Sequence, residues 1–474
     1  MTFDAAGNQI EYCTTLSLTV STPATITNAG FFCQNNNINT NDQCQITFLT
    51  VTAHSAGSTI RIQFPAEMSL NLLSSNGVVG QTGVKLGPLT YSTIGSNIVL
   101  ISDGFDSYKG ASTNCTMVLR FIQLPSTTAT TSSFVVNTET STGALVSKIS
   151  SGLTYQALPG KISAITITAT DPTVAATTTF KFLFTPTGSL AATGGIQITF
   201  PVELPIANQP SGACASGDTP SVNPTPLCSV SSQVLTVSGL FSGPYTGGTQ
   251  IGFTVNLVTN PSSTKPTSTF IIQTYSDISS SATLTDRDTT ATYAATNYAL
   301  LDSTAITIVP SSFTVSTLTT YTFTFKNKNI LFSSGTILIE IPPTVTIPNP
   351  TNAKDSFAIG SSLAATATVA VTSTTIEITN AVSSNLAAGS TISFSLTGIQ
   401  NPPTLQPSAS FTIITKTSDG YLIDGINSAV TVTMTSVPTF YHIQIIPNNY
   451  YNSAVTQYRF EITVRNQHFT GDYV

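Results

Sequence analysis

The chain has 474 residues, of which 40% are hydrophobic and only 8% are charged, and its formal net charge is −6. Serine and threonine together supply nearly a third of the chain, so the surface must consist largely of hydroxyls, amides and glycines. The plentiful apolar residues argue against a disordered chain, and the lack of a basic patch argues against nucleic acid as a partner. No apolar run approaches the roughly 18 residues that a membrane-spanning helix requires.

Residues 1–22 have the pattern of a closing strand. Segment 14–20 alternates in the same way as segment 428–434. We therefore expect residues 1–22 to be the closing strand of a preceding partial module. The first residues lack the basic and apolar regions of a signal peptide, so either a targeting segment has been removed or the sequence is a window on a longer chain.

From residue 23 onward the dominant pattern is period-two alternation, which indicates β-strands with one buried face. One such strand is present four times, at residues 44–48, 180–184, 321–325 and 458–462. Glycine pairs and an Asp-Gly pair separate the strands. No segment keeps a helical period with caps, so helices should be short or absent.

The prolines reveal a repeat. In each copy a proline ends an apolar strand and a second proline follows at a constant interval: Pro65 and Pro125, Pro201 and Pro261, Pro342 and Pro402. The first prolines of successive copies (65, 201 and 342) give a period of about 140 residues, which indicates an array of similar modules. We expect three modules at residues 23–160, 161–301 and 302–439, followed at 440–474 by the opening strands of a further partial module.

Many short strands in modules of about 140 residues predict an all-β fold. The expected architecture is a tandem array of antiparallel immunoglobulin-like β-sandwich modules. The junctions, such as residues 436–440, are short and not glycine-rich, so the array should form an elongated, semi-rigid rod.

Six cysteines without metal-ligand spacing favour three disulfides in an oxidising compartment. Cys214 and Cys228 share one loop rich in glycine, proline and serine, so we expect them to close it. Cys44 and Cys115 occupy apolar strand positions, and we expect them to form a bridge between the sheets. Cys13 and Cys33 are then left as the third pair. Six free thiols in a cytosolic protein are the alternative.

The amino-acid sequence of the turn at the second proline of each repeat is the most specific signal in the chain. Residues 259–270 read TNPSSTKPTSTF, and the third copy repeats the pattern loosely from 400 to 411, before TSDGYLID at 417–424. This resembles the tandem modules of very large Thr/Ser-rich surface proteins of ciliates and similar protists. The resemblance implies an extracellular, structural or adhesive role and carries over no catalytic residue.

Residues that could carry chemistry are scattered. His54, His442 and His468 lie in different modules and at unrelated positions of the repeat, so no nucleophilic triad is supported. Glu67 and Glu203 correspond to each other, but the third copy has Thr344 there, and we interpret them as solvated turn residues. Asp286 and Asp288, and Asp419 with Asp424, are candidate calcium ligands, but their spacing fits no EF-hand loop and the acids near the junctions are too few for a cadherin-like site. We expect no catalytic site, metal or cofactor.

These observations predict an extracellular structural protein at the cell surface, whose modules associate head-to-tail into a filament or coat, with O-linked glycans on its hydroxyl-rich surface. The alternative is an adhesin that recognises glycans or proteins through module loops such as 205–230. The partial modules at both ends would continue into a longer array or be completed by neighbouring subunits.

Overall fold

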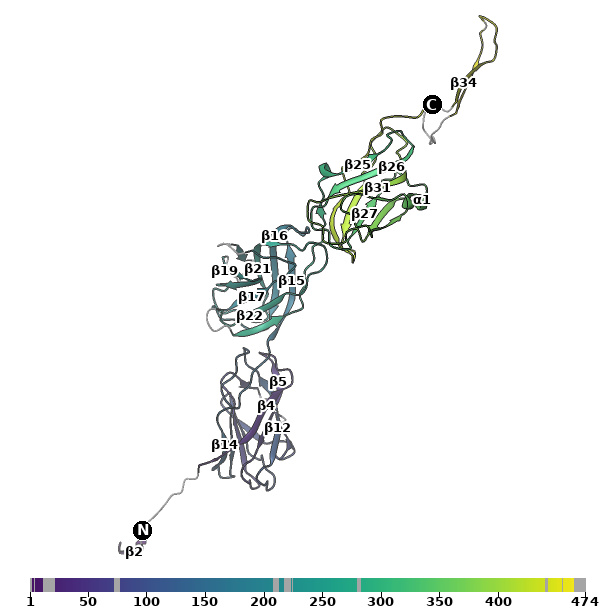
Figure 1. Cartoon of the computed structure of the whole chain (residues 1–474). Coiled ribbons are helices and arrows are strands. Elements are labelled where there is room, and N and C mark those ends of the chain that lie inside the picture. Colours follow the sequence, from purple (N-terminus) through teal and green to yellow (C-terminus); the bar gives the residue numbers. More distant parts are fainter. Residues whose placement is uncertain are drawn as a thin grey trace.

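The computed structural model is almost entirely β-structure. It describes residues 2–3, 5–11, 22–71, 77–207, 213–216, 223, 225–278, 283–439, 442–453 and 455–463. Three β-sandwiches follow one another along an elongated, bent chain, and a short hairpin lies beyond them at each end (Figure 1). The predicted tandem array of antiparallel β-sandwiches is therefore confirmed.

The first sandwich consists of two sheets. Their strand orders are β10-β11-β6-β13-β14-β3 and β4-β5-β12-β8-β9, with β7 beside β12. All pairs are antiparallel except β14 with β3. The strands are β3 (Ala24–Thr25), β4 (Thr27–Cys33), β5 (Asn41–Leu49), β6 (Thr59–Gln63), β7 (Ser69–Leu70), β8 (Val78–Thr82), β9 (Gly87–Pro88), β10 (Tyr91–Ile94), β11 (Ile98–Ile101), β12 (Asn114–Gln123), β13 (Val135–Glu139) and β14 (Leu145–Ile149).

One long strand, β15, links the two sheets of the second sandwich. It pairs in parallel with β23 at its start and antiparallel with β16 after that. The order is therefore continuous, β18-β21-β16-β15-β23-β22-β17-β20-β19. The strands are β15 (Gly160–Ala169), β16 (Thr177–Pro186), β17 (Gly195–Thr199), β18 (Cys214–Ser216), β19 (Leu227–Ser231), β20 (Val234–Ser238), β21 (Ile251–Thr259), β22 (Ile271–Tyr275) and β23 (Leu284–Asp288).

In the third sandwich the counterpart of β15 is divided into β24 and β25. The sheet orders are β24-β33-β32-β27-β30-β29 and β25-β26-β31-β28. The strands are β24 (Ala299–Leu300), β25 (Thr307–Pro310), β26 (Leu318–Lys326), β27 (Thr336–Glu340), β28 (Ala358–Ile359), β29 (Thr368–Val371), β30 (Thr375–Thr379), β31 (Thr391–Gln400), β32 (Thr412–Lys416) and β33 (Leu422–Ile426).

Helices are short, as the sequence predicts. The 3-10 helix η1 (Ser303–Ala305) lies between β24 and β25. The α-helix α1 (Pro350–Asp355) starts after Asn349, whose side chain accepts the Asn352 N–H at 3.1 Å. Proline at the first helical position suits such a start, because its missing N–H would have no partner within the helix anyway.

The same aromatic contact is at the centre of the second and third cores. Phe182 stacks on Phe253 with 5.6 Å between ring centroids and meets Phe270 edge-on at 6.0 Å. Such offset and edge-on pairs add stabilisation beyond the area that they bury. The equivalent buried residues are Phe323, Phe394 and Phe411 in the third sandwich and Ile46, Met117 and Phe134 in the first.

The two terminal hairpins lie outside the sandwiches. They are β1 (Thr2–Phe3) with β2 (Gln9–Glu11), and β34 (His442–Pro447) with β35 (Tyr458–Thr463). In β34–β35, Ile445 is opposite Phe460, as Ile308 is opposite Phe323 in β25–β26. Phe460 is 63% exposed, whereas Phe323 is completely buried. The predicted closing strand at 14–20 lies outside the described residues.

Candidate functional site: the junctions between sandwiches

Each sandwich docks on the next through the turn after the later proline of the repeat. In the first sandwich, the N–H and Oγ1 of Thr128 donate to the Leu284 carbonyl at 3.0 and 2.8 Å. In the second, the Thr264 N–H donates to the Leu422 carbonyl at 2.9 Å, and the Leu422 N–H donates to Thr264 Oγ1 at 2.9 Å. Thr128 and Thr264 are equivalent in the repeat, so both junctions share the bond from the threonine N–H to the leucine carbonyl, while the hydroxyl donates at the first junction and accepts at the second.

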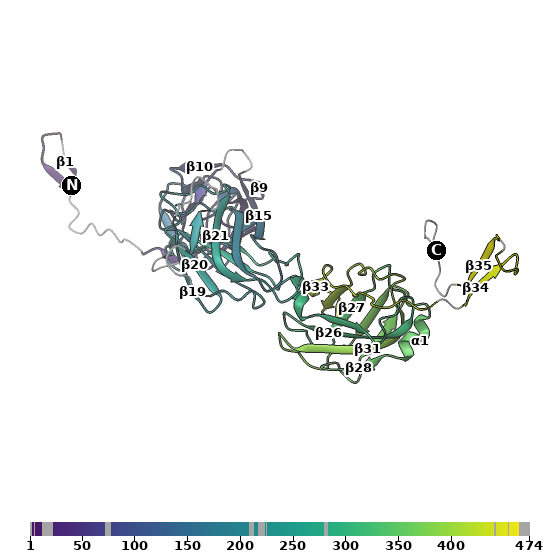
Figure 2. The ribbon, with the colours of Figure 1, turned by 90° about the horizontal axis from the view of Figure 1, so that it is seen from above.

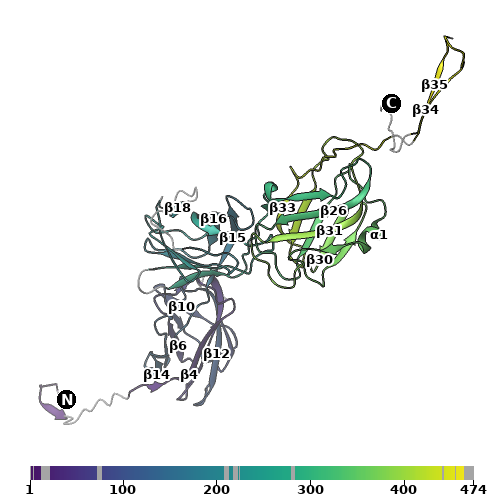
Figure 3. The same cartoon turned by 45° about the horizontal axis from the view of Figure 1, so that its top comes forward.

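The segment between two sandwiches becomes the first strand of the following one. Gly160 pairs in parallel with Asp286, and Ala299 pairs in the same way with Asp424. Figures 2 and 3 show β33 on the side of the third sandwich that faces the second. Since these segments are hydrogen-bonded into a sheet, they hold the junction more firmly than a flexible linker would. At Gly160 and Ala299 the chain begins to pair with strands of the following sandwich. The repeat places the boundaries nearby, at 160/161 and 301/302.

A buried aspartate on the paired strand receives backbone N–H groups at each junction. At the first junction, Asp286 accepts the N–H groups of Thr187 and Gly188 at 2.9 Å each. At the second, Asp424 accepts those of Lys328 and Asn329 at 3.0 and 3.1 Å. Burial raises the pKa of Asp424, although the bonds from Asn329 and Lys328 oppose that rise. Ser147 has this position in the first sandwich, and its hydroxyl meets that of Thr52 at 2.9 Å.

Small apolar contacts fill the space beside these strands. At the first junction, a Cβ added to Gly188 would lie 3.2 Å from Cδ1 of Ile38, which is fully buried. At the second, Val174 forms a buried cluster with Ala295 and Ala299. Glycine at position 188 therefore leaves room for the Asp286 carboxylate, whose Oδ2 would lie 2.8 Å from that Cβ, and for the isoleucine of the preceding sandwich.

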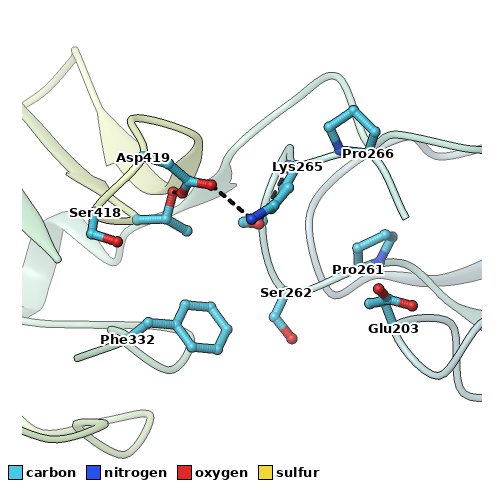
Figure 4. Close-up of a pocket in the computed structure, with 10 residues that line it drawn as sticks. Glu203, Pro261, Ser262, Lys265, Pro266, Phe332, Ser418 and Asp419 are labelled. Carbon is cyan, nitrogen blue, oxygen red and sulfur yellow. Dashed lines mark hydrogen bonds and ion pairs between the residues drawn. The ribbon is translucent and has the colours of Figure 1, made fainter. Parts of the chain in front are cut away.

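A hollow of about 440 Å³ opens at the second junction. Lys265 of the second sandwich and Asp419 of the third form an ion pair of 2.7 Å across it. Figure 4 shows Phe332 and Ser418 facing the Ser262–Lys265 turn from the other side. Both charged side chains are largely exposed, so solvent screens this pair, and its main effect is to orient the turn.

Glu67 and Glu203 are exposed turn residues, as predicted, but each also binds a serine in a way that the sequence did not reveal. Glu67 accepts the N–H and hydroxyl of Ser132 at 3.1 and 2.9 Å. Glu203 accepts the same two groups of Ser268 at 3.2 and 2.8 Å. Partial burial raises the pKa of Glu203, but the bonds from its own backbone N–H and from Ser268 lower it further, to below its usual value. The acid therefore fixes the junction turn.

The third sandwich lacks both members of this pair. Thr344 is in the place of the glutamate and Ala409 in the place of the serine, each at the same interval after its counterpart (203 to 344, 268 to 409). The two positions thus change together, as expected for partners in one contact.

The asparagine of the Asn-Pro turn is a buried hydrogen-bond centre that the sequence alone did not reveal. Asn401 Nδ2 donates to the carbonyls of Ser312 and Thr314 at 2.8 and 2.7 Å. Its Oδ1 accepts the Tyr321 hydroxyl at 2.7 Å. Asn260 makes the equivalent three contacts, with Asp171, Thr173 and Tyr293. The position is only 2% exposed in both sandwiches.

The expected bridge between Cys44 and Cys115 is wrong. These residues lie on β5 and β12, which are neighbours in one sheet, and they are not opposite each other: Cys44 pairs with Leu119. Cys33 of β4 is directly opposite Cys44, and these two form the disulfide. The Cys13–Cys33 pairing is therefore also wrong, and Cys13 lies outside the described residues.

Cys115 keeps a free, buried thiol, whose pKa burial raises to about 12. Cys214 and Cys228 are bonded, as their shared loop suggests. They connect β18 at the edge of one sheet with β19 at the edge of the other.

The remaining candidates do not converge on one site. His54 is buried and His442 is exposed on β34, while His468 lies outside the described residues. Where the chain is described, three or more His, Cys, Asp or Glu side chains nowhere gather as a metal site would require. Within the same residues, no helix has the length and apolarity to cross a membrane.

Comparisons with known proteins give no family. No protein-family model matches the chain, and no curated protein matches it. Among solved structures, it is similar to a putative membrane-anchored protein from Corynebacterium diphtheriae, with 12% identity, a TM-score of 0.20, and coverage of 87% of this chain and 92% of that one.

Two further structures are similar to parts of the chain. The C-terminal domain of the antigen I/II-family protein AspA of Streptococcus pyogenes has 6% identity and a TM-score of 0.21, covering 56% of this chain and 99% of that one. A collagen adhesin from S. aureus has 10% identity and a TM-score of 0.17, covering 65% and 96%. With TM-scores of this size, none of the three carries an argument about the role of this chain.

Proposed function

We propose that this chain is an extracellular structural protein whose β-sandwich modules form a rod and assemble head-to-tail into a filament or cell-surface coat. The repeated junction carries the proposal. Both junctions use the same turn, the same linker strand and the same buried aspartate position. Contacts reproduced from module to module set a distance and an orientation along the chain, which is the task of a rod.

The hairpin β34–β35 supports assembly with further modules. It repeats the register of β25–β26, yet Phe460 and Tyr458 are 63% and 58% exposed. A strand edge and an apolar face of this kind invite pairing. Contacts that join different surfaces and do not close into a ring give open filaments.

The surface composition and the disulfides support an extracellular location. Charged residues make up only 8% of the chain, and two disulfides are present among the residues that the structure describes. Disulfides persist in oxidising compartments. We further propose O-linked glycans on the hydroxyl-rich surface, a protein of the ciliate or protist surface type and no enzymatic activity.

An adhesive role is the second candidate. The segment around the Cys214–Cys228 bridge distinguishes the second sandwich, since it closes a loop between its two sheets with β18 and β19 at its ends. Two sheet edges joined by a disulfide form a rigid scaffold, and rigid scaffolds suit the binding of a protein or glycan.

Negative-stain microscopy over a concentration series tests the assembly. We expect filaments with a repeat of one or three modules, and we expect Phe460→Ser to abolish them by removing the central apolar side chain of the hairpin. Tyr450→Ser is the matched control, because Tyr450 is 79% exposed in the same hairpin but outside its strands. Isolated rods at every concentration would contradict the proposal.

A further inference from the structure

One sheet surface of the first sandwich differs from its counterparts in the other two. Phe32 of β4 is 62% exposed and lies opposite Gln45 of β5. The equivalent pair is Thr168 opposite Lys181 in the second sandwich and Val309 opposite Thr322 in the third. An exposed aromatic ring beside an amide is therefore a property of the first sandwich.

The ring of Phe32 is held in place by its neighbours. A Cβ added to Gly30 would lie 2.7 Å from Cε2 of Phe32, so the ring lies over the glycine backbone. The next residue, Cys33, is bonded to Cys44 on the adjacent strand. The disulfide and the close glycine contact restrict the ring before any ligand arrives, which lowers the entropic cost of binding.

Phe32 and Cys33 line two adjoining hollows, of about 350 and 270 Å³. Amide side chains supply most of the other polar groups. They are Asn36 and Gln156 in the larger hollow and Gln34, Gln43, Gln45 and Gln81 in the smaller one. Gln45 Nε2 donates to Gln81 Oε1 at 2.8 Å, which orients both amides.

The described residues that line the two hollows include no charged side chain. A charged ligand would lose hydration there without gaining an ionic partner. A sugar ring instead offers an apolar C–H face for an aromatic ring and hydroxyls that exchange hydrogen bonds with amides, each of which is both donor and acceptor.

We propose that this surface of the first sandwich binds an uncharged saccharide, with Phe32 packed against a sugar ring and the amides of Gln45 and Gln81 bonded to its hydroxyls. This site adds a ligand to the rod, and the three residues assigned to it (Phe32, Gln45 and Gln81) make none of the junction contacts described above. Its failure would leave the assembly proposal standing.

The test is a glycan microarray of neutral and acidic oligosaccharides with the full chain, followed by calorimetric titration of the best neutral hit. We expect Phe32→Ala to weaken binding by at least about tenfold, the loss typical of an anchoring aromatic residue. Val309→Ala is the matched control at the equivalent position of the third sandwich and should leave binding unchanged.

Phe32 is exposed, so the substitution should not alter the melting temperature. If Phe32→Ala nevertheless fails to fold, Gln81→Ala, on the exposed side of β8, takes its place as the test variant. We expect this variant to lose binding as well. Absence of a neutral hit, hits limited to acidic sugars, or equal losses in Phe32→Ala and Val309→Ala would each overturn the proposal. So would a Phe32→Ala variant that loses self-association but keeps the sugar, because the surface would then be a protein contact.

Discussion

His54 shows how one buried polar side chain can make a sandwich sensitive to pH. It is 2% exposed and its ring stacks on Phe105 at 4.7 Å between centroids. Neither ring nitrogen has a hydrogen-bond partner among the described residues. The backbone of His54 pairs with that of Lys109, whose side chain forms an ion pair with Asp106. Burial lowers the pKa of His54 below 6.5.

Acid should therefore destabilise the first sandwich. Because the folded-state pKa is lowered, the unfolded chain binds the proton more readily, and stability is lost as the pH falls below about 6.5. We expect the melting temperature of this sandwich to fall by several degrees between pH 7 and pH 5, as measured by calorimetry. His54→Phe should flatten the dependence in that window. An unchanged slope in the variant would refute the role of His54.

At the scale of elements, the Asn-Pro turn shows how one contact can be supplied by different strands. The hydroxyl that reaches Asn401 comes from Tyr321 on β26. The hydroxyl that reaches Asn260 comes from Tyr293, which follows β23. In the first sandwich a buried Leu124 replaces the asparagine, and the Tyr155 hydroxyl donates instead to Asn36 Oδ1 at 3.2 Å. The three sandwiches thus differ in which tyrosine supplies the hydroxyl or in which asparagine accepts it.

Substitution at this centre should be costly. Asn401→Leu leaves the Tyr321 hydroxyl and two carbonyls without partners, and we expect a loss of about 2–4 kcal/mol in the unfolding free energy of the third sandwich. Tyr321→Phe removes only one hydroxyl and should cost about 1 kcal/mol. In the double variant the two losses should not add, because the leucine then faces an apolar ring. Additive losses in denaturant titrations would contradict a shared contact.

The sequence predicted the strands well and the partners of polar residues poorly. Alternation identified the strands because one face of each strand is buried, and strand-ending prolines recur at fixed intervals. The Cys44–Cys115 bridge proved wrong because alternation tells which face a side chain occupies but not which strand lies beside it. Cys33 and Cys44 become neighbours only through the β4–β5 register.

The junction could have been partly predicted from the sequence. Thr264 lies inside the turn that we singled out, and its counterpart Thr128 recurs in the first copy. The carbonyls that they reach, on Leu284 and Leu422, come from a distant hairpin, and nothing in the TSDGYLID segment that contains Leu422 indicates that the turn binds there. Hydrogen bonds to the backbone do not constrain the partner's side chain, so the sequence contains no mark of them.

On the scale of the whole molecule, two junctions of one design turn three sandwiches into a single elongated body. Figure 1 shows the sandwiches in succession rather than packed side by side, so these junctions are the principal links between them. Hydrogen bonds between the turn and the hairpin, a paired linker strand and a buried aspartate act together at each one. The account therefore depends on the junctions holding a defined orientation in solution.

Small-angle X-ray scattering of the full chain tests this most directly. We expect the wild-type profile to fit one elongated conformation. Thr264→Pro combined with Asp419→Ala removes the junction N–H, the hydroxyl and the ion pair, and should broaden the distribution of overall dimensions. Leu405→Pro, at the equivalent position of the third sandwich, is the control and should leave the profile unchanged. A wild-type profile that already requires a broad ensemble, identical to that of the junction variant, would contradict the account.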